Sequence, residues 1–184
     1  PWRLSALPGR KHSRWKKAAI DTMITSVQNP KIKWLRELQG SSRERREAGL
    51  FVAEGVRLLE EALAAGWQAH SVFCLEALEL RAQAVLDGFA ARGAVLEMVA
   101  PHALAAASDT ETPQGVLAVL HLPQPQPPDQ LDFAFIPDQV RDPGNLGTML
   151  RTAAAVGVGA VLLPPGGVDP YSPKVLRSGM GAHF

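Results

Sequence analysis

The sequence contains a single cysteine, Cys74, among its 184 residues. One thiol can build neither a disulfide framework nor a multi-thiolate metal site, and it is typical of a protein from a reducing compartment. Long apolar runs are also missing, because the best candidate, residues 153–168, is interrupted by several glycines and prolines. That run falls short of the roughly 18–20 apolar residues needed to cross a bilayer. We therefore expect a cytoplasmic protein with no membrane segment.

The signatures of several common enzyme classes are absent too. There is no GxxxxGK(S/T) phosphate loop and no GxSxG nucleophile elbow. Gly157 and Gly159 follow a predicted helix and precede a predicted strand, which is the reverse of a dinucleotide-binding loop. The histidines show no metal-ligand spacing, so we expect no metal and only structural or surface roles for His12, His70, His102, His121 and His183. Simple hydrolases and dehydrogenases are therefore disfavoured.

The charge is distributed unevenly along the chain. The net charge is +1, but residues 1–50 hold 12 of the 19 lysines and arginines and only 4 of the 18 acidic residues. A basic block of this kind attracts a polyanion such as RNA, although a solvated helix face has the same composition. Residues 1–22 are the most one-sided part, and we expect a disordered basic extension there. It could be an over-extended start, an RNA-binding arm or a transit peptide.

The hydrophobic pattern predicts an α/β protein in two parts. In the first part, residues 23–121, it predicts helices at 31–38, 56–65, 76–91 and 101–107 and strands at 50–53, 71–75, 95–99 and 115–121. Such alternation favours a mostly parallel sheet that is covered on both faces. Four prolines make residues 122–129 a stiff linker. The second part, residues 130–184, has predicted strands at 131–136 and 160–163 and helices at 146–156 and 172–177, too little for a complete layer.

The most informative stretch of the sequence surrounds the predicted helix at 146–156. A Pro143-Gly144 turn leads into this helix, Asn145 is a suitable N-cap, and Gly147 allows a close approach to the first turn. Free backbone N–H groups at this point would attract an anion. Arg151 follows Asn145 by six residues. Taken one residue at a time, an ordinary capped helix with one surface arginine explains the same sequence.

Taken as a string, the stretch resembles the first signature motif of the SpoU-type RNA ribose 2′-O-methyltransferases of the SPOUT (trefoil-knot) superfamily. The matching residues are Asn145, Gly147, Thr148, Arg151, Thr152 and Ala153. Residues 168–184 are similar to the segment that follows this motif in the family. Near the start of the chain, Asn29-Pro30-Lys31 and the run from Phe51 to Arg57 look like the small substrate-binding domain that precedes the catalytic domain.

The resemblance implies transfer of a methyl group from S-adenosylmethionine to a ribose 2′-hydroxyl of ribosomal or transfer RNA. It gives catalytic roles to Arg151, which would clamp a phosphate because a guanidinium is a poor base, and to Asn145, which would shape the active-site loop. Glu54 is expected only to cap or pair locally. The RNA would be held by basic side chains of the front domain; the alternative is that these side chains form a solvated face. They are Lys31, Lys33, Arg36, Arg43, Arg45, Arg46 and Arg57.

The family also carries two later motifs that complete the cofactor pocket and thread the knot, and residues 1–184 contain neither. Gly179 departs from the small polar residue expected at its position. The resemblance thus implies a truncated chain: an RNA-binding α/β domain and the first half of a SPOUT domain, inactive alone, without cofactor-binding residues, and dimeric only when complete. One alternative is a non-catalytic RNA-binding protein that uses the front domain. Another is a nucleotide-binding protein that uses the Asn145 helix start.

Overall fold

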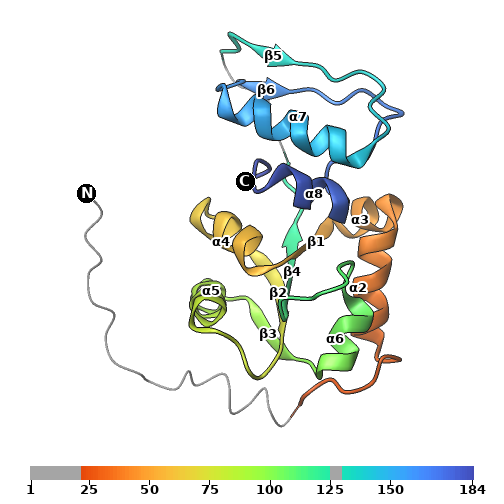
Figure 1. Cartoon of the computed structure of the whole chain (residues 1–184), viewed down its shortest axis with the longest axis vertical. Helices are drawn as coiled ribbons and strands as arrows, with labels where there is room; N and C mark the ends of the chain where they lie inside the picture. Colours follow the sequence, from red (N-terminus) through yellow and green to blue (C-terminus); the bar gives the residue numbers. More distant parts are fainter. Residues whose placement is uncertain (1–21, 125–129) are drawn as a thin grey trace, which may run out of the picture.

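The computed structural model describes residues 22–124 and 130–184. A front domain is built around a four-stranded sheet, and a smaller unit is stacked on one end of it (Figure 1). The predicted extension, apart from its last residue, and residues 125–129 of the predicted linker lie outside the described residues. No helix in the described ranges is both long enough and apolar enough to cross a membrane.

Two capped helices begin the front domain. Helix α2 spans Pro30–Gly40, and the Asn29 side chain accepts a hydrogen bond from the Lys31 N–H at 2.9 Å. Helix α3 spans Ser42–Ala48 and ends at Gly49, whose φ of 65° is the left-handed conformation that glycine adopts readily. The charged run at residues 42–47, for which the hydrophobic pattern predicts no element, therefore lies in a complete helix.

The sheet of the front domain has the strand order β1-β4-β2-β3. Its strands are β1 (Leu50–Glu54), β2 (Ala69–Cys74), β3 (Val95–Met98) and β4 (Val116–His121). The helices that connect them are α4 (Val56–Ala64), α5 (Leu80–Ala91) and α6 (Pro101–Ala107). The predicted α/β class is confirmed, although α5 begins four residues later than we expected.

The expectation of a mostly parallel sheet is wrong. Strands β1, β2 and β3 share one direction, as the alternation of helices and strands predicts, but only β2 and β3 are parallel neighbours. Strand β4 lies between β1 and β2 and runs antiparallel to both. Alternation predicts the direction of strands joined by crossover helices, but it does not reveal where a final strand inserts.

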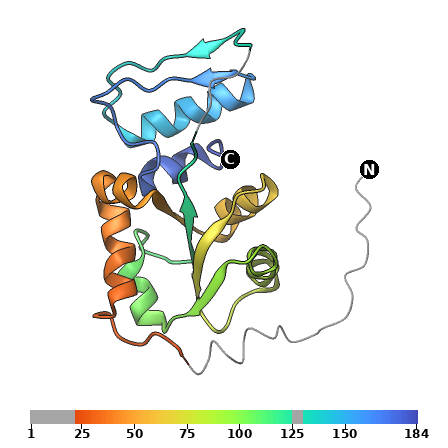
Figure 2. The same cartoon turned by 180° about the vertical axis from the view of Figure 1, so that it is seen from behind.

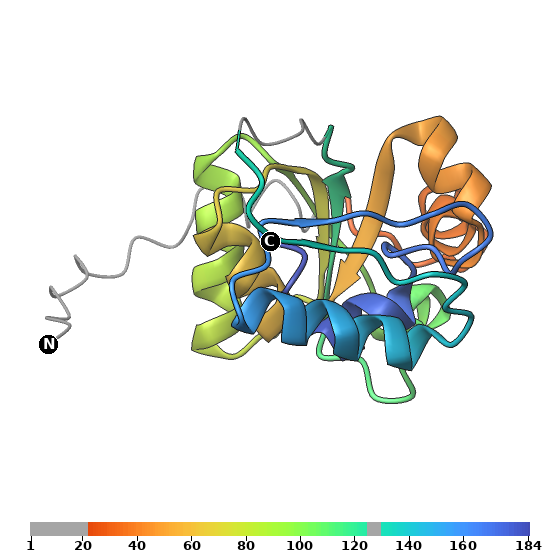
Figure 3. The ribbon, with the colours of Figure 1, turned by 90° about the horizontal axis from the view of Figure 1, so that it is seen from above.

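Helices cover both faces of this sheet. Val116, Ala118 and Leu120 of β4 pack in the core under α4 and α5, whereas Leu117 and Val119 pack under α2 and α6. Figures 2 and 3 show these two helical layers on opposite sides of the strands. Alternate residues thus fill two separate cores, as the period of two along a strand requires. Cys74 is buried in the first core.

The second unit is a short β-α-β arrangement followed by one more helix. Its elements are β5 (Ala134–Phe135), α7 (Pro143–Ala155), β6 (Ala160–Val161) and α8 (Pro173–Gly179). Strands β5 and β6 are parallel, and each is shorter than the sequence predicted. Each strand pairs with one neighbour among the described residues, and the flanking apolar residues Phe133, Ile136 and Leu162 are exposed.

Helix α8 joins the two parts of the molecule. Val175 packs against Leu146 and Leu150 of α7, whereas the next residue, Leu176, belongs to the core under α4. On the same side, Tyr171 contacts the Phe51 ring with 4.9 Å between centroids. Figure 1 shows α8 between α7 and the front domain.

Candidate functional site

Helix α7 begins differently from our prediction. Asp142, not Asn145, is the N-cap: its carboxylate accepts a hydrogen bond from the Asn145 N–H at 2.7 Å, and Pro143 occupies the first helical turn. Aspartate caps as well as asparagine, and proline fixes a helical φ at the next position, so the Asp-Pro pair was the relevant signal. The backbone N–H of Asn145 is therefore already bonded to a carboxylate of the chain itself. The expectation of free N–H groups for an outside anion is wrong at this position.

The exposed face of α7 carries both predicted catalytic residues. Asn145 and Arg151 are exposed, and Arg151 forms no ion pair with any part of the chain that the structure describes. Between them, the Thr148 hydroxyl donates to the Gly144 carbonyl at 2.9 Å. The guanidinium of Arg151 is thus available to a phosphate, which is the role that the motif implies.

The buried face of α7 crosses α8 at very short range. A Cβ placed on Gly147 would lie 1.9 Å from the Ser178 Oγ and 2.8 Å from the Gly179 nitrogen. The Ser178 hydroxyl lies 3.2 Å from the Pro143 carbonyl, which links α8 to the start of α7. The motif glycine is therefore required for the two signature segments to touch.

Gly179 also has a local explanation. A Cβ at this position would lie 2.6 Å from the His183 Cε1, so the ring of His183 takes the space of a side chain. The Nε2 of His183 donates to the Pro170 carbonyl at 2.9 Å. Burial lowers the pKa of His183, although that carbonyl acts in the opposite direction. Nearby, burial and then the charge of Asp169 raise the pKa of Tyr171 to about 12.

The predicted RNA-binding residues do not form one patch. Lys33 and Arg36 on α2 and Arg46 on α3 are exposed, and α2 and α3 are in contact. Lys31 is paired with Glu97, and Arg43 is paired with Glu47 at 2.7 Å. These five residues form what we call the α2–α3 basic face. Arg45 and Arg57 lie elsewhere.

Arg45 is not a surface residue, and its prediction as an RNA ligand is wrong. It is only 3% exposed. Its Nε and Nη2 donate to the Asp169 Oδ2 at 2.8 and 2.6 Å, and its Nη1 donates to the carbonyls of Leu38 and Gln39. Arg45 thus connects the front domain to the loop before α8, and four of its five N–H donors are already bonded within the chain.

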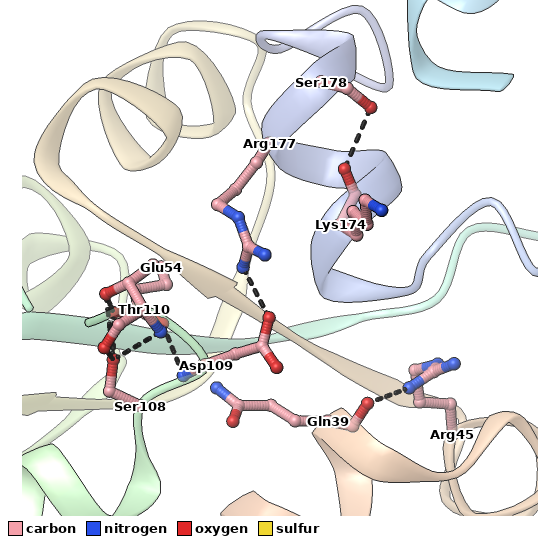
Figure 4. Close-up of polar contacts among 9 residues, drawn as sticks. All are labelled: Gln39, Arg45, Glu54, Ser108, Asp109, Thr110, Lys174, Arg177 and Ser178. Carbon is pink, nitrogen blue, oxygen red and sulfur yellow. Dashed lines mark hydrogen bonds and ion pairs between the residues drawn. The ribbon is translucent and has the colours of Figure 1, made fainter. Parts of the chain in front are cut away.

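Arg57 lines a cavity of about 380 Å³ between the front domain and α8. The cavity is also lined by Glu54, Thr110 and Arg177, the last of which is bonded to Asp109 at 2.7 Å (Figure 4). Glu54 accepts hydrogen bonds from the loop that carries Thr110, which fits the local role expected of it. Arg177 was not predicted as a site residue, because only the fold brings α8 to this loop.

No cluster of histidine, cysteine or acidic side chains in the described ranges could hold a metal ion. The hollow beside the α7 motif, about 260 Å³, is lined mainly by apolar residues such as Phe133, Met149 and Val156. It is smaller than the roughly 300–1,000 Å³ usual for ligand pockets. Its only hydroxyls, on Thr148 and Thr152, are bonded to the helix backbone. These residues do not fit a polar nucleoside cofactor by themselves.

Two family sequence profiles match the chain one after the other. The MRM3-like substrate binding domain matches residues 29–118, and the SpoU rRNA Methylase family matches residues 132–184. The two matched ranges therefore contain the α2–α3 basic face and the α7–α8 crossing respectively.

Individual relatives agree with these profiles. The chain is 41% identical over 162 residues to an uncharacterised tRNA/rRNA methyltransferase of Synechocystis, covering 86% of this chain and 58% of that protein. It is 37% identical over 161 residues to the 23S rRNA (guanosine(2553)-2′-O)-methyltransferase RlmP of Bacillus subtilis, covering 88% and 62%. The AdoMet-bound rRNA methyltransferase from Sinorhizobium meliloti is similar in structure, with a TM-score of 0.76, 30% identity and coverage of 88% and 61%.

A substrate-binding domain in front of a methylase domain defines a class of two-domain RNA-modifying proteins. Within that class, residues 132–184 match the SpoU rRNA Methylase family, as the motif from Asn145 to Arg151 predicted. It spans about 60% of the length of the relatives described above.

Proposed function

We propose that the whole protein transfers a methyl group to a ribose 2′-hydroxyl of ribosomal or transfer RNA. The observation that carries this proposal is the α7–α8 crossing, where Gly147 meets Ser178 and an exposed Arg151 projects from the same helix. This is the family motif in a folded form, and it follows directly after a substrate-binding domain.

Each motif residue has a proposed role in this reaction. Arg151 clamps and orients a phosphate next to the target ribose, since its guanidinium stays protonated and offers a planar fork of donors. Asn145 shapes the loop at the start of α7. The 2′-hydroxyl itself distinguishes RNA from DNA, and the α2–α3 basic face holds the RNA backbone.

S-adenosylmethionine supplies the methyl group when it is bound, as the AdoMet-bound relative from Sinorhizobium meliloti suggests. Because the hollow beside α7 does not fit such a cofactor, we assign no cofactor contact to the described residues. We also propose that the whole protein is a cytoplasmic homodimer. A buried, lone Cys74 suits a reducing compartment.

We propose domain boundaries at residues 23–121 and 130–184, with the linker at residues 122–129. The interval between the two family matches, which end and begin at residues 118 and 132, supports this division.

The activity is tested with a chimera. Residues 1–184 are joined to the part of the Bacillus subtilis relative that lies beyond its matched region, and ribosomal RNA is incubated with tritiated S-adenosylmethionine. We expect label in alkali-resistant dinucleotides, because a 2′-O-methyl group blocks cleavage. Arg151→Ala should lower the rate about 100-fold through loss of positioning. Arg92→Gln, at an exposed position at the end of α5, should leave the rate unchanged. Equal rates for all three proteins would contradict the role of Arg151.

The second candidate is a non-catalytic RNA-binding protein. The observation that favours it is the apolar hollow beside α7, whose two hydroxyls already donate their hydrogens to the helix backbone. We expect calorimetry to show no micromolar binding of S-adenosylmethionine to residues 1–184. A chimera that folds and binds RNA but transfers no label would favour this candidate over the enzyme.

A further inference from the structure

The cavity between the front domain and α8 lies apart from the α7 motif. Helix α8 touches α7 through Val175 and Ser178, whereas Arg177 and Met180 line the cavity. Figure 4 shows Arg177 extending from α8 toward Asp109 of the front domain. The opposite wall is made by Arg57 and Leu58 of α4 and by Thr112 of the loop before β4. Its volume of about 380 Å³ is within the usual range of ligand pockets.

The walls of this cavity are already fixed by hydrogen bonds. The Glu54 carboxylate accepts hydrogen bonds from the Ser108 and Thr110 hydroxyls and, at 3.1 Å, from the Asp109 N–H. Below it, the Gln114 side chain accepts from the Val56 N–H at 2.9 Å and so fixes the start of α4. A ligand would therefore enter a formed site and would not need to order a loop.

The lining has the chemistry that recognises a nucleotide. Two guanidiniums, Arg57 and Arg177, come from the two different parts of the chain, and Leu58 and Met180 add apolar surface. Glu54 is the acidic residue of the lining, and its oxygens are already occupied by the loop. Guanidiniums bind phosphate in a bidentate manner and stack on bases, and unpaired bases of RNA insert into such surfaces.

Arg177 can exchange its present partner for a phosphate. Its ion pair with Asp109 is 2.7 Å long, and the two side chains are 36% and 44% exposed. A pair this open to solvent contributes little net free energy, so a phosphate oxygen can displace the aspartate without a large penalty.

We propose that this cavity binds one unstacked nucleotide of single-stranded RNA, with Arg57 and Arg177 on its phosphate and the base against Leu58 and Met180. The site would hold a nucleotide that neighbours the methylated one and would fix the RNA relative to both parts of the protein. The proposal rests on the proposed function, because it takes RNA as the substrate.

The first test uses residues 1–184 and fluorescence anisotropy with a fluorescein-labelled 12-nucleotide single-stranded RNA, compared with the same sequence as a duplex. Arg57→Gln removes one guanidinium, and Thr112→Trp fills the cavity from an exposed loop position. Each should weaken single-strand binding about fivefold or more and change duplex binding less than about twofold. Arg92→Gln, which removes the same charge elsewhere, should change neither affinity.

The second test uses a variant that should strengthen the binding of single-stranded RNA. Asp109→Asn frees Arg177 and should tighten single-strand binding about two- to threefold. Glu111→Gln removes an equal charge from the same loop without lining the cavity, and it should have a smaller effect. Equal effects of Asp109→Asn and Glu111→Gln would overturn the exchange of partners.

The outcomes separate the two proposals. If single-stranded RNA binds and only variants of the α2–α3 basic face, such as Arg36→Gln, weaken it, the cavity proposal is wrong and RNA binding stands. If neither RNA binds residues 1–184 at low salt, the RNA-directed function itself is contradicted.

Discussion

At the scale of single residues, two neighbouring arginines of α3 lie in opposite environments. Arg45 has the same local sequence features as its exposed neighbour Arg46, yet only Arg45 is buried. What separates them is Asp169, which lies 124 residues away and which no local pattern can bring to Arg45.

Arg45 and Arg46 form a matched pair for mutation. Arg45→Ala leaves Asp169 and two backbone carbonyls without their donors and should lower the free energy of unfolding by about 3–5 kcal/mol. Arg46→Ala removes an exposed side chain and should stay within about 0.5 kcal/mol of the parent. Urea denaturation measures both changes. Similar values for the two variants would show that the contact between Arg45 and Asp169 does not contribute to stability.

His183 predicts a pH dependence of stability. Burial lowers its pKa below the ordinary value of 6.5, so the unfolded chain takes up a proton before the folded chain does. The contribution of neutral His183 is therefore present above pH 6.5 and is lost as the pH falls through the lower folded pKa. The thermal midpoint should drop more between pH 7.5 and pH 5.5 in the parent than in His183→Gln, which has a donor that does not titrate. An equal drop in both proteins would contradict this role.

At the scale of elements, the predicted helix and strand boundaries were wrong where tertiary contacts determine them. The motif sequence predicted a helix near residues 146–156, but its start depends on Asp142, and its crossing with α8 depends on Gly147. Strands β5 and β6 are shorter than their apolar runs, because pairing among the described residues stops where no further strand lies alongside. An apolar run indicates that a segment tends to be buried, but it does not indicate how many of its residues will pair with a neighbouring strand.

The α7–α8 crossing can be tested with one substitution at two glycines. Gly147→Ala places a methyl group against Ser178 and the Gly179 backbone and should lower the free energy of unfolding by about 1–3 kcal/mol. Gly40→Ala, at the end of α2 with open space around it, should raise that free energy by about 0.4–1 kcal/mol by restricting the unfolded chain. The two changes are compared by chemical denaturation. If Gly147→Ala left the free energy of unfolding unchanged, α7 and α8 would be able to move apart without destabilising the protein.

At the scale of the whole molecule, the α/β class and the two matched parts of the chain were predictable, but their arrangement was not. The insertion of β4 between β1 and β2, and the docking of α8 on the front domain, both bring together segments that are distant in sequence. Neither leaves a periodic pattern in the chain. For the same reason, a cavity shared by Arg57 and Arg177 could not be predicted from the sequence.

Two neighbouring residues of α8 test how the parts are coupled. Leu176→Ala should speed hydrogen exchange in β1 and α4, because Leu176 completes the core beneath them. Val175→Ala should speed exchange mainly in α7, against which Val175 packs. Mass spectrometry of peptides from each element separates the two patterns. The same exchange pattern in both variants would show that α8 does not divide its packing in this way.

The position of α8 also bears on how the chain matures during translation. The strands and helices of the front domain emerge from the ribosome before residues 173–179, yet Leu176 covers part of the core of that domain. The front domain therefore leaves part of its apolar core exposed to solvent until α8 has been synthesised. Nascent chains stalled before α8 should accordingly be more sensitive to protease than chains stalled after it has cleared the exit tunnel.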